Sequence, residues 1–76
     1  MKVKILNINN DSISEKEIGE IVDAKRFYEL TKDEIEESVG KIDTNDTLWE
    51  IDDIFIHEKD NYWVYMLDDD VEIIEE

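Results

Sequence analysis

Cysteine and proline are absent from this chain of 76 residues, and histidine occurs only once. Without cysteine there is neither a disulfide nor thiolate chemistry, and no His/Cys cluster suggests a structural zinc. A Gly/Ser-rich linker and an internal repeat are also absent, so we predict a single domain over residues 1–76. No apolar run reaches the length of a signal peptide or a membrane span. We therefore expect a cytoplasmic protein that does not contact a membrane.

Basic residues are scarce, with eight Lys and Arg against 23 Asp and Glu, and the formal net charge is −15. The imbalance is concentrated in residues 42–76, where thirteen acids accompany one base, Lys59, and the formal charge is −12. The hydrophobic fraction of 41% is nevertheless too high for a disordered acidic chain. These numbers indicate a folded, strongly negative surface, which repels nucleic acid and anionic membranes and attracts basic proteins.

The first half of the chain predicts one or two strands followed by a helix. Residues 2–8 are short and β-branched, which favours a strand. Residues 17–22 fit either a second strand or the start of a helix. Over residues 24–42, apolar and small side chains recur at spacings of three and four, which predicts a helix of about four turns.

Two sets of capping residues compete for the start of this helix. Asp23 is placed to cap a helix that begins at residue 24, and Gly40 lies where a left-handed C-terminal cap is expected. Thr31 and Glu34 form an alternative capping box, which would divide the segment and begin a separate helix at Lys32.

The second half changes to the period of a β-sheet. Residues 47–52 alternate between apolar and polar side chains, which predicts a strand. Asp60 and Asn61 fit a two-residue hairpin loop between strands over residues 54–59 and 62–67.

The hairpin loop predicts a register in which Phe55 lies opposite Met66 and Ile56 lies opposite Tyr65. Residues 71–74 fit a short last strand. The predicted fold class is α+β, with N-terminal strands, one helix and a C-terminal antiparallel β-meander.

The acidic residues of the second half are the candidate binding surface. Alternate residues on a strand lie roughly 6.6 Å apart on one face, so carboxylates placed there can imitate rows of DNA phosphates. The acids expected to contact a partner are Asp43, Asp46, Glu50, Asp52, Asp53, Glu58, Asp60, Asp68, Asp69, Asp70 and Glu72. The alternative is that they are ordinary solvated side chains, as charge runs usually are. A charge of −15 concentrated in the apparent sheet favours mimicry.

Metal binding and catalysis find little support. Residues from Asp43 onward partly fit a calcium loop, but Leu48 replaces the turn glycine and Ile54 replaces the bidentate glutamate. His57 is the single histidine, and no nucleophile or phosphate-binding loop accompanies it. We therefore expect a protein that is not an enzyme and has no cofactor or metal.

The aromatic residues of the predicted hairpin suggest a homodimer. Strand alternation sends Trp63 and Tyr65 to one face of the sheet and Tyr62 to the other. A single helix covers only one of these faces, so the other is expected to expose either Trp63 and Tyr65 or Tyr62 and Val64, apolar surface of the kind that marks interfaces. Trp63 and Tyr65 are the candidate dimer contact, and oligomerisation is a common support for a core this small.

In length, charge and composition, with twelve isoleucines and one arginine, the chain resembles small acidic early proteins of phages of Gram-positive bacteria that mimic DNA. The resemblance implies an inhibitor that occupies the nucleic-acid-binding site of a basic host protein in the host cytoplasm. The nucleoid protein HU is favoured as the target, and the sliding clamp comes second. The closing residues 70–76 are also similar to the ends of small phage SH3-like barrels. The alternative function is an acidic adaptor or accessory protein that binds a basic partner without DNA-like geometry.

Overall fold

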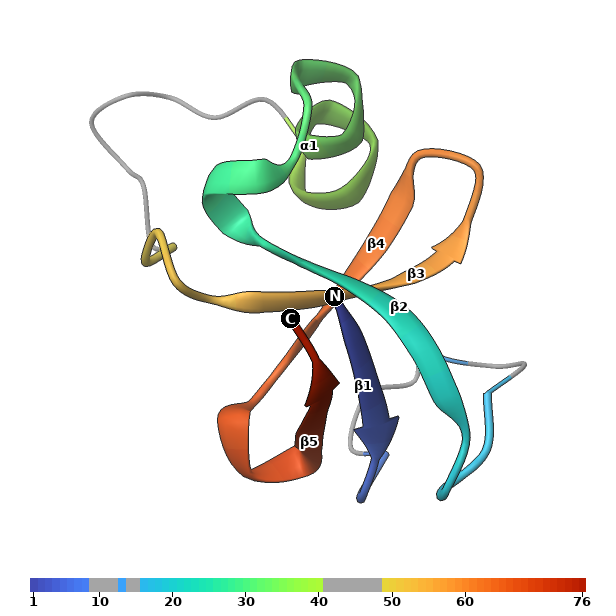
Figure 1. The fold of residues 1–76 in the computed structure, drawn as a ribbon. Coiled ribbons are helices and arrows are strands. Elements are labelled where there is room, and N and C mark those ends of the chain that lie inside the picture. Colours follow the sequence, from blue (N-terminus) through green and yellow to red (C-terminus); the bar gives the residue numbers. More distant parts are fainter. Residues whose placement is uncertain (9–12, 14–15, 41–48) are drawn as a thin grey trace.

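The computed structural model describes residues 1–8, 13, 16–40 and 49–76, and these residues form an α+β fold with five strands and one α-helix. The strands make one antiparallel sheet in the order β4-β3-β2-β1-β5 (Figure 1). The predicted α+β class is confirmed, with a C-terminal hairpin in an antiparallel sheet. The elements are β1 (Lys2–Ile5), β2 (Ile21–Arg26), the 3-10 turn η1 (Phe27–Glu29), α1 (Lys32–Val39), β3 (Ile54–Lys59), β4 (Tyr62–Met66), the 3-10 turn η2 (Asp68–Asp70) and β5 (Val71–Glu75).

Strand β2 connects the two halves of the sheet. Its first residues pair with β1, as in Lys4 opposite Ile21, and its last residues pair with β3, as in Ala24 opposite Ile56. The strand curves between the two pairings in Figure 1. The sheet curls so far that Met66, at the end of β4, and Val71, at the start of β5, belong to the same core although these strands are the two edges.

The core has two parts, one on each face of the curled sheet. The inner part consists of Val3, Ile5, Ile13, Val22, Ala24, Ile54, Ile56, Val64, Met66 and Val71. The outer part lies between the β3–β4 hairpin and α1, and consists of Leu30, Phe55 and Trp63 with Phe27, Ile35, Val39, Trp49 and Tyr65 packed against them. Alternation along β3 produces this division, because Ile54 and Ile56 point inward while Phe55 points outward.

The predicted four-turn helix is wrong, and the alternative capping box is confirmed. The helix α1 has eight residues, and residues 24–26 belong to β2 instead. The Thr31 hydroxyl accepts a hydrogen bond from the Glu34 amide at 3.2 Å, and the Glu34 carboxylate accepts one from the Thr31 amide at 2.8 Å. Gly40 caps the C-terminus with φ 83°, as predicted. The undecided residues 17–22 enter a strand at Ile21.

The predicted hairpin is confirmed, but most of its register is shifted by one residue. Lys59 and Tyr62 flank the Asp60–Asn61 loop as expected, and a bulge between His57 and Lys59 then displaces the remaining pairs. Phe55 therefore lies opposite Tyr65 rather than Met66. The extra residue at a bulge is invisible to pairing rules that start from the loop.

Two further predictions for the second half need correction. Residues 49–53 form a turn rather than a strand, and residues 47 and 48 lie outside the described residues. The last strand exists as β5, but it leaves the meander and pairs with β1, with Val71 opposite Ile5. The turn η2 makes this change of direction between β4 and β5 (Figure 1).

Candidate partner-binding surface

Acidic side chains lie in the two turns where the strands of the β3–β4 hairpin end away from its loop. The turn before β3 and the turn η2 after β4 both start from this end, because Ile54 pairs with Met66. In Figure 1 the turn before β3 lies at the left near η1, and η2 lies at the lower left, on the other side of β3 in this view. We call five of these acids the hairpin-base cluster: Glu50, Asp52, Asp53, Asp68 and Asp69. All but one of the five are exposed; Asp53 is half-buried, and its carboxylate accepts from the Glu50 amide at 2.9 Å.

The phenol of Tyr65 is influenced by the charges of carboxylates from both turns. Burial raises the pKa of Tyr65 above its ordinary value of 10.0, and the carboxylates of Asp53 and Asp68 raise the pKa further. Carboxylates from both turns therefore act on one half-buried side chain. The field at this end of the hairpin is negative enough to disfavour a further negative charge.

The other predicted acids occupy different places. Glu58 and Asp60 lie at the loop end of the hairpin, separated from the hairpin-base cluster by the length of β3, roughly 16 Å for six residues. Glu72 lies on β5 opposite Lys4. Asp43 and Asp46 fall outside the described residues. The structure thus divides the described acids between two ends of the hairpin and one edge strand, rather than placing them in rows along a strand.

Asp70 does not belong to the exposed surface predicted from the sequence. Asp70 is only 8% exposed, and its backbone carbonyl accepts hydrogen bonds from the amides of Leu6 at 2.8 Å and Asn7 at 3.2 Å. Asp70 therefore fixes the connection between η2 and the end of β1. Its neighbours Asp68 and Asp69 remain exposed.

The ion pairs of the fold leave the hairpin-base cluster unneutralised. Within the described ranges, the pairs are Lys2–Asp23, Lys16–Glu20, Lys25–Glu34 and Arg26–Glu76. None of them involves a carboxylate of the cluster. Arg26 approaches it, but its guanidinium donates to the backbone carbonyl of Asp52 at 3.1 Å rather than to the carboxylate. The cluster's charge is therefore available to an external cation.

The helix adds acids that sequence reasoning did not include. Asp33, Glu36 and Glu37 are exposed on α1, which packs against β4. They were left out because they precede residue 42, where the charge imbalance begins. The capping box at Thr31 was the available signal, since it defines which of the following residues belong to one short helix.

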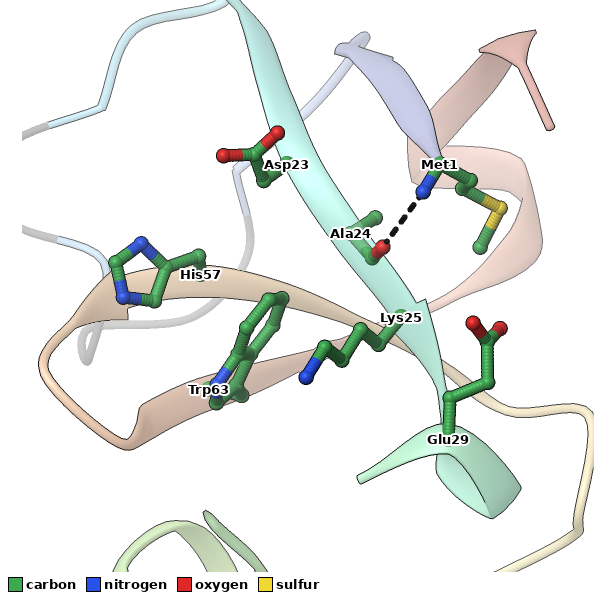
Figure 2. A pocket seen from close by; sticks show the side chains of 7 residues that line it. All are labelled: Met1, Asp23, Ala24, Lys25, Glu29, His57 and Trp63. Carbon is green, nitrogen blue, oxygen red and sulfur yellow. Dashed lines mark hydrogen bonds between the residues drawn. The ribbon is translucent and has the colours of Figure 1, made fainter. Parts of the chain in front are cut away.

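A surface pocket of about 350 Å³ lies on the outer face of the sheet, between β2 and the hairpin. Figure 2 shows its lining, in which the side chain of Lys25 extends toward the ring of Trp63. The Lys25 ammonium lies 5.0 Å from the ring centroid, a cation–π arrangement. The same ammonium donates to both carboxylate oxygens of Glu34, at 3.0 and 3.1 Å.

Glu34 is the more buried partner of the Lys25–Glu34 ion pair. Burial alone would raise the pKa of its carboxyl, but hydrogen bonds from the Thr31 amide and the Lys25 ammonium, with the charge of Lys25, outweigh burial and lower the pKa. Glu34 is consequently held as a carboxylate at neutral pH. The ion pair joins α1 to β2 across the edge of the outer core.

Two further polar side chains of the pocket, His57 and Asp23, have partners within the fold, whereas the buried indole N–H of Trp63 has no hydrogen-bond partner among the described residues. The His57 ring is tilted by 50° against the Trp63 ring, with ring centroids 4.9 Å apart, and its Nε2 lies 3.0 Å from the carbonyl oxygen of Asp60. Asp23 pairs with Lys2, whose hydrogen bond and charge lower the pKa of Asp23. These groups are arranged to support the sheet, so we place the candidate functional site at the acidic surface rather than in the pocket.

The predicted dimer contact is not exposed. Trp63 is buried in the outer core and Tyr65 is half-buried beside it, because α1 and Trp49 cover this face of the hairpin. The expectation that one sheet face exposes aromatic side chains is therefore wrong for these two residues. Both faces of the hairpin are used by a core, since Val64 and Tyr62 contact the inner one.

The described residues hold neither a metal-binding group nor a membrane-spanning helix. No group of three or more metal-binding side chains is found among them. No helix within the same residues is long and apolar enough to cross a membrane. The chain matches no protein-family model, no curated protein and no solved structure.

Proposed function

We propose that this protein is a DNA-mimicking inhibitor that binds the nucleic-acid-binding site of a basic protein and excludes DNA from it. The nucleoid protein HU is our first candidate target and the sliding clamp the second, both on the basis of the resemblance in size and charge. The observation that carries the proposal is a formal charge of −15 on a folded domain of 76 residues.

The distribution of ion pairs supports an external use for this charge. The basic side chains of the described pairs, Lys2, Lys16, Lys25 and Arg26, all precede residue 42. Their only acidic partner in the second half is Glu76. Self-repulsion on this scale destabilises a compact domain, so a basic partner that neutralises it gains binding free energy from its relief.

The spacing of the acids also supports mimicry. The hairpin-base cluster is separated by roughly 16 Å along β3 from the acids at the hairpin loop, of which Asp60 is exposed and Glu58 is half-buried with its Oε2 inside the fold. The two phosphate rows of B-DNA border a major groove about 12 Å wide. Two groups of carboxylates at this separation offer a basic groove-binding element a comparable pair of contacts. Association is then fast and strongly salt-dependent.

The first test is capture of the target from a lysate of a Gram-positive bacterium with the tagged protein, followed by salt washes and a challenge with duplex DNA. Mimicry predicts a small basic DNA-binding protein that DNA displaces. A partner that DNA does not displace would indicate an acidic adaptor instead. Binding to purified HU, measured against salt concentration, then tests the favoured target.

A pair of variants with equal charge change separates a specific surface from general acidity. Asp68→Asn with Asp69→Asn removes two charges from the hairpin-base cluster, and Glu36→Gln with Glu37→Gln removes two from α1. All four side chains are exposed, so folding should be unaffected. We expect the first variant to weaken binding more than the second. Equal weakening would mean that only net charge matters.

We also propose that the protein forms a homodimer through exposed apolar side chains other than Trp63 and Tyr65. Leu6 and Ile18 are exposed around the connection between β1 and β2. Sedimentation velocity at increasing concentration tests this directly, and a monomer at tens of micromolar would contradict it.

A further inference from the structure

A second group of exposed apolar side chains lies within the hairpin-base cluster. Tyr28 is 62% exposed, Ile51 66% and Leu67 52%. The Tyr28 amide donates to the Ile51 carbonyl at 3.2 Å, so these two residues are neighbours. Leu67 directly follows the Ile54–Met66 pair and therefore leaves the same end of the hairpin.

Carboxylates flank Ile51 and Leu67 in the sequence. Ile51 stands between Glu50 and Asp52, and Leu67 precedes Asp68. Neither turn has an ion pair among the described residues. The carboxylate of Asp53 accepts from the Glu50 amide at 2.9 Å, and the exposed acids of the two turns can face a partner. Apolar side chains enclosed by polar ones are typical of protein interfaces, where tyrosine is enriched.

We propose that Tyr28, Ile51 and Leu67 form the apolar centre of a docking surface for a basic, amphipathic protein segment. This inference rests on the proposed function and specifies the chemistry of its partner. Lysine and arginine side chains of the segment meet the hairpin-base cluster, and apolar side chains between them cover the three exposed residues. Duplex DNA presents phosphates but no such apolar side chains. The protein would therefore make an apolar contact with its basic partner that DNA does not make.

The negative charge of the hairpin-base cluster favours a basic segment over other apolar partners at this surface. A second copy of the chain would bring another strongly negative domain against the cluster, and like charges across an interface oppose binding. An anionic membrane is repelled for the same reason. A basic segment is attracted by the rim and gains further affinity from burial of Tyr28 and Ile51.

The test uses two labelled synthetic peptides with the same number of lysines, one with leucines between them and the other with serines in their place. Fluorescence anisotropy gives Kd for each peptide at low and at physiological salt. We expect the leucine peptide to bind at least about tenfold more tightly, and Tyr28→Ser or Ile51→Ser to reduce this ratio at least about fivefold.

Ile21→Ser is the matched control. Ile21 is 57% exposed but lies at the start of β2, where it pairs with Lys4 of β1. The control should leave the ratio of the two Kd values unchanged. A ratio near one for the unaltered protein, or an equal loss in the Ile21→Ser control, would overturn the inference. Loss of a dimer in the Ile51→Ser variant, seen by sedimentation, would also overturn it by identifying a self-contact.

The same measurements distinguish failure of this inference from failure of the proposed function. If both peptides bind with strong salt dependence but equal Kd, the electrostatic function stands and the apolar centre is wrong. If neither peptide binds in a salt-dependent manner, the electrostatic function itself fails. Circular dichroism of each variant confirms that the fold is retained.

Discussion

Removing the ammonium of Lys25 should destabilise the protein more than neutralising its partner Glu34. The two side chains differ in exposure, since the side chain of Lys25 is 32% exposed and that of Glu34 is 9% exposed. In Lys25→Met, the Glu34 carboxylate loses its counterion and cannot reach water. In Glu34→Gln, the freed ammonium turns to solvent, and the amide oxygen still accepts from Thr31 to retain the capping box.

The expected magnitudes follow from this asymmetry. Breaking a fully buried ion pair costs about 3–5 kcal/mol, and an exposed pair contributes roughly 0.2–1 kcal/mol. The Lys25–Glu34 pair lies between these limits. We expect a loss of about 2 kcal/mol for Lys25→Met, which includes about 0.5 kcal/mol for the cation–π contact with Trp63. We expect about 1 kcal/mol for Glu34→Gln.

Urea denaturation followed by tryptophan fluorescence measures these losses, and the double variant completes a cycle. A coupling free energy of about 1 kcal/mol is expected, because the double variant no longer buries an unpaired charge. The pH dependence provides an independent check. The pKa of Glu34 is lowered in the folded state, so its stabilisation is present above about pH 4.5 and is lost as the pH falls through the folded-state pKa.

Two results would refute this reasoning. A Lys25→Met variant that is as stable as Glu34→Gln would show that the Glu34 carboxylate is adequately solvated without its partner. A difference between the unaltered protein and Glu34→Gln that persists unchanged at pH 3 would show that the ionised carboxylate is not the source of the stabilisation.

Four further predictions concern other features of the fold. Ser38→Ala should lower the free energy of unfolding, measured by urea denaturation, by about 1–2 kcal/mol, because the Ser38 hydroxyl accepts from the Trp63 amide at 2.7 Å and joins α1 to β4. An unchanged free energy of unfolding would show that this hydrogen bond does not stabilise the protein. Gly40→Ala should lower the free energy of unfolding by about 1–3 kcal/mol, because residues other than glycine are strained at φ 83° and ψ −171°. The added Cβ atom would contact no neighbouring atom, so backbone strain is the only expected cost. Unchanged stability would mean that the cap rearranges. Asp70→Ala should destabilise the protein by about 1–3 kcal/mol because Asp70 is buried, whereas Asp69→Ala, at an exposed position, should change stability by less than about 0.5 kcal/mol. Equal effects of the two substitutions would contradict the burial of Asp70. Raising NaCl to 1 M should increase Tm by roughly 4–8 °C, about 1 kcal/mol, by screening self-repulsion, and a lower Tm in calorimetry would contradict this.

The sequence by itself determined the features that depend on neighbouring residues. Asp60 and Asn61 define the hairpin loop because a two-residue connection admits few conformations, and Asp60 indeed has a positive φ of 49°. Thr31 and Glu34 define the start of α1 because their two hydrogen bonds span only three residues. The concentration of acids after residue 42 needs no structure at all.

Tertiary structure decided the features that depend on contacts between distant segments. Residues 24–26 fit the helical period of the sequence, and pairing with β3 selects the strand instead. The bulge beside Glu58 and the departure of β5 to β1 likewise follow from how the sheet closes around its inner core. Burial of Trp63 requires α1 to lie over the hairpin, and local periodicity carries no information about that placement.

The candidate surface shows the same division. Sequence alone identified its acids, but not that Tyr28 would lie beside Ile51 or that Asp70 would be buried. Charge is a sum over residues and can be read from the sequence without a fold. Exposure and proximity are properties of packed segments, and they exist only once the chain has closed on itself.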